Sequence, residues 1–311
     1  MNAVRIHGFG DASVLTLEEI PVPDVGEEDV LIRVVAAGVN PVDWKIREGH
    51  LKDVVAHRLR LTLGWVASGV VESVGRSVRR LRPGDVVYTR PDIVRDGAYA
   101  EYIAVRESEV ALRPTTISHV EAASLPLAGI TAWEAIVNVG QVSAGQRVLI
   151  HAAAGGVGSL AVQLAKWRGA EVIATTSARN ADFVTFLGAD TVVDYQKENV
   201  AKSLRGIDVV FDTVGGQVQQ DSWATLKPGG LLVSIVDLPP EAEARARGVR
   251  SAFVFIQPSR TILDQLAGLV DVGQVRPLIG AEFALRDAAA AQRLSQSGRA
   301  RGKIVLYVGT P

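Results

Sequence analysis

A glycine-rich turn in the middle of the chain has the spacing that phosphate binding requires. It reads Ala152-Ala153-Ala154-Gly155-Gly156-Val157-Gly158, after the apolar segment 147–151 and before a helix-length segment with an apolar face. Glycine lets the backbone approach a pyrophosphate, and the N-terminus of a following helix offers free amides and partial positive charge. Ala153 stands where GxGxxG has its first glycine, so a tight turn without a ligand is the alternative. We expect Ala154, Gly155, Gly156 and Val157 to bind the pyrophosphate of a dinucleotide.

The segment that follows the next apolar strand indicates which dinucleotide binds. About 20 residues beyond the fingerprint, NAD enzymes place Asp or Glu on the ribose 2′-hydroxyl, whereas NADP enzymes supply hydroxyls and a cation. The segment here reads Thr175-Thr176-Ser177-Ala178-Arg179-Asn180 and contains no acid. We therefore expect Thr176, Ser177 and Arg179 to face the 2′-phosphate of NADPH, with an exposed polar loop as the alternative. Tyr195 either closes over the same phosphate or packs as an ordinary side chain.

These residues need a sheet that brings strand ends together, and residues 119–258 predict one. Six compact apolar segments, separated by helix-length stretches, are typical of parallel strands covered on both faces. Their expected bounds are 148–151, 171–175, 191–193, 208–211, 231–235 and 253–256. Six such strands indicate a Rossmann fold, a doubly wound parallel sheet of the α/β class that binds dinucleotides at the carboxyl ends of its strands.

The first 115 residues follow a different pattern. Segments rich in Val, Ile and Tyr at 30–36, 69–74, 85–89 and 99–105 alternate with turns, which predicts a mostly β domain. After about residue 258 come an amphipathic helix, a break at Pro277, an alanine-rich helix at 285–294 and a last strand at 303–308. Periodicity alone does not say whether this tail joins the first domain.

Composition narrows the class of partner. The 311 residues include 33 Lys and Arg and 34 Asp and Glu spread along the chain, so no basic face for nucleic acid or anionic lipid is evident. No segment approaches the roughly 20 apolar residues that span a bilayer, and the N-terminus has no signal-peptide run. We expect a small-molecule partner, no nucleic acid, no membrane, and a cytoplasmic location.

The chain contains no cysteine, which excludes disulfides, thiolate zinc sites, iron–sulfur clusters and a cysteine nucleophile. The histidines do not form a ligand set at zinc spacing, because they are scattered singly at His7, His50, His57, His119 and His151. The sequence therefore predicts no metal site.

Several further segments have a recognisable order. They are AGVNPVDWK at 37–45, GWVASGVV at 64–71, PGDVV at 83–87, GAYAEY at 97–102, LPLAGITAW at 125–133, FDTVG at 211–215 and GKIV at 302–305. Together with the glycine turn, and along essentially the whole chain, they resemble the medium-chain dehydrogenase/reductase superfamily. Within it they resemble the zinc-free quinone oxidoreductase branch, including its enone reductases.

The resemblance implies a GroES-like, mostly β catalytic domain formed by residues 1–118 and 259–311, with a Rossmann NADP-binding domain, residues 119–258, inserted between them. It implies a homodimer or homotetramer that pairs through the last Rossmann strand, at 253–256. Zinc members of the superfamily hold their catalytic metal with Cys and His, where this chain has Asn40, Asp43 and Gly64-Trp65-Val66. Zinc-free members often carry an acid where Val66 stands, so the chain departs from them there.

The resemblance also implies roles for single residues. Lys45, in a run shared with enone reductases, is the first candidate for catalysis and Asn40 the second, since both can donate hydrogen bonds to the cofactor or to a developing enolate oxygen. The alternatives are a solvated surface lysine at 45, a turn residue at 40 and a helix-capping role for Asp43. Further cofactor contacts are implied for Thr131, Thr213, Val214 and Lys303, although Thr131 is equally suited to bonding its own helix.

The sequence as a whole predicts an NADPH-dependent, zinc-free reductase that transfers hydride to a quinone or an α,β-unsaturated carbonyl compound. Without a Lewis acid an alcohol is hard to deprotonate, so simple alcohol dehydrogenation is disfavoured. The alternatives are an enoyl-thioester or biosynthetic enone reductase, and an NADPH-binding sensor or structural protein with little turnover.

Overall fold

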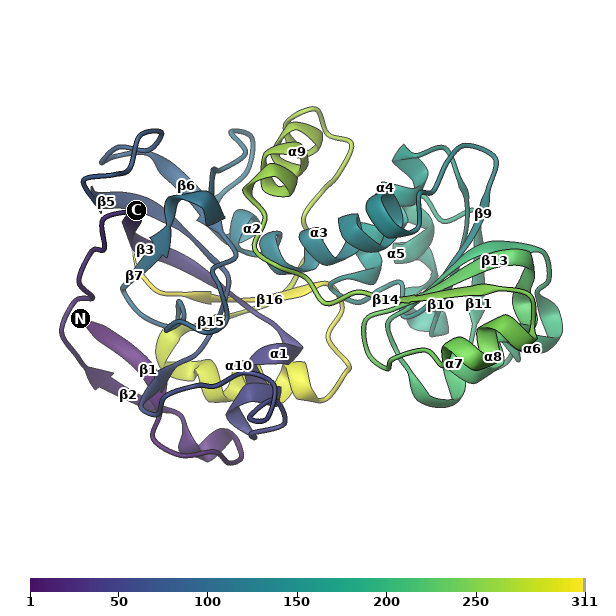
Figure 1. Ribbon diagram of the computed structural model, residues 1–311, viewed down its shortest axis with the longest axis horizontal. Helices are drawn as coiled ribbons and strands as arrows, with labels where there is room; N and C mark the ends of the chain where they lie inside the picture. Colours follow the sequence, from purple (N-terminus) through teal and green to yellow (C-terminus); the bar gives the residue numbers. More distant parts are fainter. Residues whose placement is uncertain (310–311) are drawn as a thin grey trace. The chain divides into compact units, whose positions relative to one another are not determined.

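The computed structural model describes residues 1–309, which form two compact units (Figure 1). Among the described residues, the first unit consists of Met1–Leu127, Gln257–Gly273 and 277–309. The second consists of Ala128–Ile256 with the short piece Gln274–Arg276. Both ends of the chain therefore belong to the first unit, and the middle belongs to the second.

The first unit is mostly β structure. Within the described residues its strands are β1 (Asn2–Ile6), β2 (Thr16–Glu19), β3 (Asp29–Val39), β4 (Leu61–Thr62), β5 (Ala67–Val74), β6 (Val86–Thr89), β7 (Tyr102–Arg106), β8 (Val110–Leu112), β15 (Ile279–Ala284) and β16 (Lys303–Tyr307). A small sheet has the order β2-β1-β4, and a larger one has the order β15-β16-β3-β5-β6-β8 with β7 on β3. In the larger sheet, β3 ends directly before Asn40 and β16 begins at Lys303, two of the residues discussed below.

Strand β3 is the centre of this larger sheet. It pairs antiparallel with β5, with β7 and, through Ile304 opposite Val39, with β16. Almost every side chain of β3 is buried, which explains its continuous apolar sequence. The last strand of the chain is thereby fixed beside a strand from its first forty residues.

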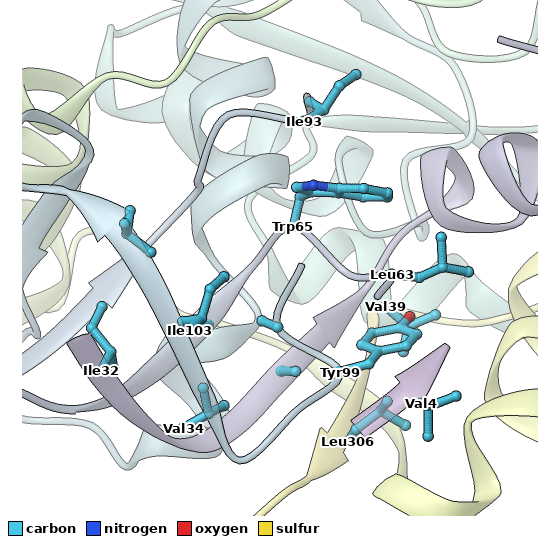
Figure 2. Close-up of a cluster of buried hydrophobic side chains, with 14 of the residues drawn as sticks. Val4, Ile32, Val34, Val39, Leu63, Trp65, Ile93, Tyr99, Ile103 and Leu306 are labelled. Atoms are coloured by element: carbon cyan, nitrogen blue, oxygen red, sulfur yellow. The ribbon is translucent and has the colours of Figure 1, made fainter. Parts of the chain in front are cut away.

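The core of the first unit lies around two fully buried aromatic rings. Figure 2 shows Trp65 and Tyr99 among aliphatic side chains of β3, β16 and neighbouring segments. The Trp65 indole N–H donates to the Arg95 carbonyl at 3.0 Å, so this polar atom is satisfied in the interior. Both rings belong to the core, and neither is a surface feature.

Several helices of this unit pack against its sheets and against one another. They are α1 (Pro41–Arg47), α2 (His119–Ala123), α9 (Arg260–Asp271) and α10 (Ala288–Gln296), and α3 (Pro126–Trp133) leads into the second unit. The fully buried Arg47 guanidinium joins α1 to α10, since it donates to the Gln292 side chain at 2.8 Å and to the Gly10 carbonyl at 3.1 Å. These bonds fix α1, which starts at the end of β3.

The second unit is a parallel sheet with helices on both faces (Figure 1). Its strands are β9 (Arg147–Ile150), β10 (Glu171–Thr176), β11 (Thr191–Asp194), β12 (Ile207–Asp212), β13 (Leu226–Ser234) and β14 (Arg250–Phe253), and its helices are α4 (Gly158–Trp167), α5 (Ala181–Phe186), α6 (Val200–Ser203), α7 (Gly216–Ser222) and α8 (Glu241–Ala246). The strand order is β11-β10-β9-β12-β13-β14, and every neighbouring pair is parallel. This is the dinucleotide-binding order, so the predicted fold class is confirmed.

Several elements differ from the sequence expectations, among them the short strands β1, β2, β4 and β8, which were not expected, and the two strands β14 and β15. The last Rossmann strand was expected at 253–256, but β14 spans Arg250–Phe253, with Arg250 opposite Leu231. Because β14 is the outermost strand of the sheet, it tolerates polar residues that apolar patterning misses. Strand β15 was not expected, since its half-exposed side chains give only a weak pattern.

Close packing of α4 on the end of β9 depends on Gly158. A Cβ atom there would stand 2.4 Å from the Ala152 carbonyl oxygen and 2.9 Å from the Ala153 Cα. Both contacts are with backbone, which cannot rotate away. The helix that follows the glycine turn can therefore sit at this distance only with glycine at position 158.

We predict that Gly158→Ala destabilises the second unit by about 1–3 kcal/mol, because the backbone must shift to admit the methyl group. Gly268→Ala is the matched control: Gly268 lies in α9 with nothing within 4 Å of its Cβ position, and we expect a gain of about 0.5–1 kcal/mol. Urea unfolding of both variants measures the difference. Equal effects of the two substitutions would contradict the packing argument.

Candidate active site

The glycine turn lies between β9 and α4, as the sequence predicts. The Gly155 amide donates to the Ala152 carbonyl at 2.9 Å, and the Ser159 amide donates to the Gly155 carbonyl at 2.9 Å. Ala152 has a φ of 45°, which lets the chain reverse direction immediately after the strand. The predicted residues Ala154 to Val157 occupy this turn, and the strand–turn–helix context of a pyrophosphate site is present.

The residues predicted for the 2′-phosphate lie at two adjacent strand ends. Buried Thr176 ends β10, and Ser177 and Arg179 follow it in a short helical turn. Tyr195, 57% exposed, directly follows β11, the parallel neighbour of β10. Arg179 is exposed and forms no hydrogen bond or ion pair with any of residues 1–309. The Arg179 guanidinium and the hydroxyls of Ser177 and Tyr195 therefore follow the carboxyl ends of two adjacent strands.

One carboxylate at this edge was missed by the sequence analysis. Asp194 ends β11 opposite Thr176 in the pairing of the two strands. One of its oxygens accepts from the Gln196 amide at 3.1 Å, and Lys197 lies 3.9 Å from the other. This acid belongs to the neighbouring strand, so counting residues after the fingerprint could not find it. Lys197 partly offsets its charge.

The carboxyl ends of β9 and β12 lie side by side where the strand order of the sheet reverses. Such a reversal is where open α/β sheets bind ligands. The predicted residue Thr213 follows β12, and its hydroxyl donates to the His151 carbonyl, just after β9, at 2.8 Å. Val214, the next predicted residue, is 45% exposed. The bond from Thr213 therefore ties the two strand ends together.

Asp212 holds this loop and was also missed by the sequence analysis. Its fully buried carboxylate accepts hydrogen bonds from the Val214 and Gly215 amides, each at 2.9 Å. Its other oxygen accepts from the Gln219 side chain at 3.1 Å and the Ser234 hydroxyl at 3.0 Å. The sequence contained a signal for this role. Asp212 ends a buried apolar strand, and a buried carboxylate needs hydrogen-bond donors.

Asn40 stands at the junction of β3 and α1. Its side chain is buried, Pro41 follows it as the first residue of the helix, and its backbone amide donates to the Asp43 carboxylate at 2.7 Å. Proline is favoured there because the first helical amide has no partner within the helix. Asp43 therefore acts as a helix cap, the alternative that the sequence left open, and Asn40 lies at the N-cap position.

Two buried ionisable groups, Lys303 and Asp43, form hydrogen bonds with Asn40. The Lys303 ammonium donates to the Val39 carbonyl at 3.0 Å and to the Asn40 side-chain oxygen. The Tyr99 hydroxyl donates to the Asp43 carboxylate at 2.8 Å. Residues 263 positions apart in the chain, Asn40 and Lys303, are thus in direct contact.

Burial shifts the protonation of both groups. It raises the pKa of Asp43 to about 7, although bonds from Asn40 and Tyr99 and the charge of Lys303 oppose the rise. It lowers the pKa of Lys303 to about 8, against the opposing effect of the Asp43 charge. The two groups therefore titrate near neutrality and depend on each other.

Lys45 is placed differently from Lys303. It is half-exposed on α1, and its ammonium lies 5.8 Å from the centre of the Trp44 ring. It forms no hydrogen bond or ion pair with any of the residues that the structure describes. Its ammonium is therefore available to a ligand, whereas that of Lys303 is bonded to protein. The remaining predicted contact, Thr131, is buried on α3.

The described residues contain no group of three or more His, Cys, Asp or Glu side chains that could hold a metal ion. Trp65 and Val66, in the region where zinc members carry a ligand, are buried and have no metal-binding atoms. Independence of zinc stays a prediction. Among residues 1–309, no helix has the length and apolar character needed to cross a bilayer.

A cavity of about 780 Å³ lies in the first unit, away from these residues. It is bordered by α2, β15 and β16, and its lining includes His119, Arg113 and Tyr307. Burial, aided by Arg113 and Arg33, lowers the pKa of His119 to about 4. No predicted site residue lines this cavity, so its volume alone does not make it the active site.

Comparisons with known proteins agree with this geometry. Residues 26–115 match the alcohol dehydrogenase GroES-like domain, and residues 187–306 match a family described as zinc-binding dehydrogenase. The chain is 37% identical to the chloroplastic NADPH-dependent alkenal/one oxidoreductase of Arabidopsis thaliana, over 99% of this chain and 79% of that protein. The chain belongs to the medium-chain dehydrogenase/reductase superfamily.

Solved structures place this superfamily member in the quinone oxidoreductase and enone reductase branch. The quinone oxidoreductase from Coxiella burnetii superposes with a TM-score of 0.91 at 36% identity, over 99% of each chain. Escherichia coli quinone oxidoreductase, solved in complex with NADPH, superposes with a TM-score of 0.91 at 27% identity, over 99% of this chain and 100% of that one. The predicted family is therefore confirmed, and the two units are a GroES-like unit and a Rossmann unit.

We predict that Asp43→Asn changes how stability depends on pH. The unfolded carboxyl titrates near 3.8 and the folded one near 7, so between these values the wild-type native state holds a proton that the unfolded chain has released. Wild-type stability from this group therefore falls as pH rises through that window. The variant lacks the proton, so its free energy of unfolding relative to wild type should rise by on the order of 2 kcal/mol between about pH 5 and about pH 7.5.

Urea unfolding at the two pH values measures this difference. Asp53→Asn, at an exposed position on the loop after α1, is the matched control and should show no such trend. A difference between Asp43→Asn and wild type that stays constant with pH would show that Asp43 does not titrate in this range.

Proposed function

We propose that this chain is an NADPH-dependent reductase that transfers hydride to a quinone or an α,β-unsaturated carbonyl compound. The observation that carries the proposal is the pair of strand ends where Ser177, Arg179 and Tyr195 offer hydroxyls and an uncommitted cation. A 2′-phosphate needs such partners, and a ribose 2′-hydroxyl does not. The relatives support it, since one is named as NADPH-dependent and another was solved with NADPH.

The other cofactor contacts follow the geometry of the Rossmann unit. We assign the pyrophosphate to the turn Ala154, Gly155, Gly156 and Val157, which precedes the N-terminus of α4. We assign the nicotinamide half to Thr213 and Val214, at the point where the strand order reverses. Thr131 is a further proposed contact, from the family resemblance alone.

Hydride transfer from NADPH to such an acceptor requires two things of the protein. Bound NADPH supplies the hydride, and the protein must hold the acceptor and stabilise the negative charge that develops on its carbonyl oxygen. We propose Asn40 and Lys45 as the donors to that oxygen. Lys45 fits this role because its half-exposed ammonium forms no hydrogen bond or ion pair with the described residues, and an ammonium stabilises negative charge on an oxygen that it approaches.

The domain division that we propose is a GroES-like catalytic domain of residues 1–118 and 259–311 with a Rossmann domain of residues 119–258. The two compact units support this division.

We also propose that the reaction needs no zinc and that the protein is cytoplasmic. Activity that survives a chelator tests the first point, and cell fractionation tests the second.

We propose that the protein forms a homodimer or homotetramer through β14. This strand is the outermost of its sheet, and Phe253 and Phe255 are 38% and 53% exposed. An unpaired edge with exposed aromatic side chains invites pairing with a second copy. Light scattering of the purified protein decides the point, since a monomer would exclude it.

The decisive experiment follows oxidation of NADPH and of NADH against quinones, 2-alkenals, enones and enoyl thioesters, with and without a chelator. We expect turnover with NADPH and a quinone or an enone, unaffected by the chelator. Binding of NADPH without turnover of any acceptor would leave a binding protein instead of an enzyme. Reduction of enoyl thioesters alone would move the chain to the thioester reductases.

We predict that Arg179→Ala reduces the preference for NADPH over NADH by about tenfold or more, because it removes a charge-assisted bond to the 2′-phosphate. Binding of the two cofactors is measured by fluorescence titration. Arg245→Ala removes another exposed arginine of the same unit, on α8, and should leave the preference unchanged. If Arg179→Ala prefers NADPH over NADH as strongly as wild type does, Arg179 does not bind the 2′-phosphate.

We predict that Lys45→Ala lowers the turnover number roughly 10- to 100-fold and changes NADPH affinity little, because the lost bond forms mainly to the reacting oxygen. Steady-state kinetics with an enone and a binding titration separate the two effects. Lys52→Ala, at an exposed position nearby, is the control. An unchanged turnover number would remove Lys45 from the mechanism.

A further inference from the structure

Two side-chain bonds and one backbone bond hold Asn40 within the first unit. Its amide oxygen accepts from Lys303, its amide nitrogen donates to the Gly38 carbonyl at 3.2 Å, and its backbone amide donates to Asp43. Only 1% of the residue is exposed. A side chain bonded this completely has one orientation.

Lys303 decides which orientation that is. An asparagine amide can present either its oxygen or its NH₂ group, and the two look alike in shape. A lysine ammonium has three donors and no acceptor, so it can face only the amide oxygen of Asn40. The NH₂ group then points away from Lys303. One of its hydrogens bonds to the Gly38 carbonyl, and the other forms no hydrogen bond with any of residues 1–309, so it remains a donor.

We infer that Lys303 is a positioning residue that makes Asn40 a hydrogen-bond donor to a ligand carbonyl oxygen. This inference rests on the proposed function, in which a carbonyl oxygen gains negative charge, and replaces direct cofactor binding by Lys303. An amide oxygen presented at that point would repel the charge, whereas an NH₂ group stabilises it. The ligand oxygen belongs either to the acceptor or to the carboxamide of the nicotinamide, and the two are separated by the test below.

Asp43 allows the ammonium to remain charged in the interior. A buried ammonium without a partner loses its proton, and the Asp43 charge opposes that loss. The same carboxylate is fixed by the Asn40 amide and by the Tyr99 hydroxyl. Lys303 and Asp43 therefore both help to hold the Asn40 side chain in this orientation.

A double-mutant cycle tests this inference. Lys303→Met, Asn40→Ala and the double variant are compared for the NADPH dissociation constant, for the turnover number, and for the KM of an enone. We expect each single variant to lose about tenfold or more in at least one of these quantities. The double variant should lose no more than Asn40→Ala alone. Losses that multiply in the double variant would show that Lys303 acts on the ligand by itself, and would overturn the inference.

The pattern of losses identifies the ligand oxygen. A weaker NADPH dissociation constant assigns it to the nicotinamide carboxamide, and a lower turnover number at unchanged NADPH affinity assigns it to the acceptor. Lys166→Met is the matched control, because Lys166 also donates to a backbone carbonyl and to one side chain, Asp190, elsewhere in the protein. It should change none of these quantities.

Asn40→Asp keeps the test valid if Lys303→Met does not fold. This variant keeps an oxygen facing Lys303 but lacks the NH₂ donor, so it should lose as much as Asn40→Ala. Wild-type values in Asn40→Asp would overturn the inference. If the wild-type protein reduces no acceptor, the proposed function fails separately and NADPH binding alone decides. An unchanged dissociation constant in a folded Lys303→Met variant would then overturn the inference.

Discussion

The pairing of β16 with β3 is the constraint on which the rest of the first unit depends. It places the last strand of the chain beside a strand from its first forty residues, and the Rossmann unit lies within the stretch of chain between them. The same pairing sets Lys303, the first residue of β16, beside Val39 and Asn40, the residues at which β3 gives way to α1. The strand pairing therefore brings together Asn40 and Lys303, the two residues of the further inference.

Charges buried at that point are expensive, and they are weak evidence for stability. Asp43 and Lys303 each lose hydration, and the titration of both near neutrality reflects that loss. What the arrangement provides is a defined geometry: a capped helix at α1, a single amide orientation at Asn40 and a half-exposed neighbour, Lys45, on the same helix. In the Rossmann unit, Asp212 has a comparable role, because its buried carboxylate holds the loop that carries Thr213 and Val214.

Local sequence predicted the Rossmann unit well and the first unit less well, for physical reasons. Buried parallel strands are continuous apolar runs, and a glycine turn between strand and helix can be recognised in a single segment, so the sheet and the position of the turn between β9 and α4 could be predicted. The polar edge strand β14 and the half-exposed β15 lack such a pattern. The contact of Lys303 with Asn40 spans 263 residues, and periodicity holds no information about pairing at that distance. Asp194 was missed because it lies opposite Thr176 at the end of the neighbouring strand, outside the segment that follows β10.

We propose that hydride passes from NADPH to the carbon β to a carbonyl group, with negative charge collecting on the carbonyl oxygen. Reduction of an enone with NADPH carrying deuterium at C4, in each of its two epimers, tests this claim most directly when the product is examined by NMR and mass spectrometry. We predict one deuterium, from one epimer only, on the β-carbon of a saturated ketone. Deuterium on the carbonyl carbon of an allylic alcohol, or in no product from either epimer, would contradict the account.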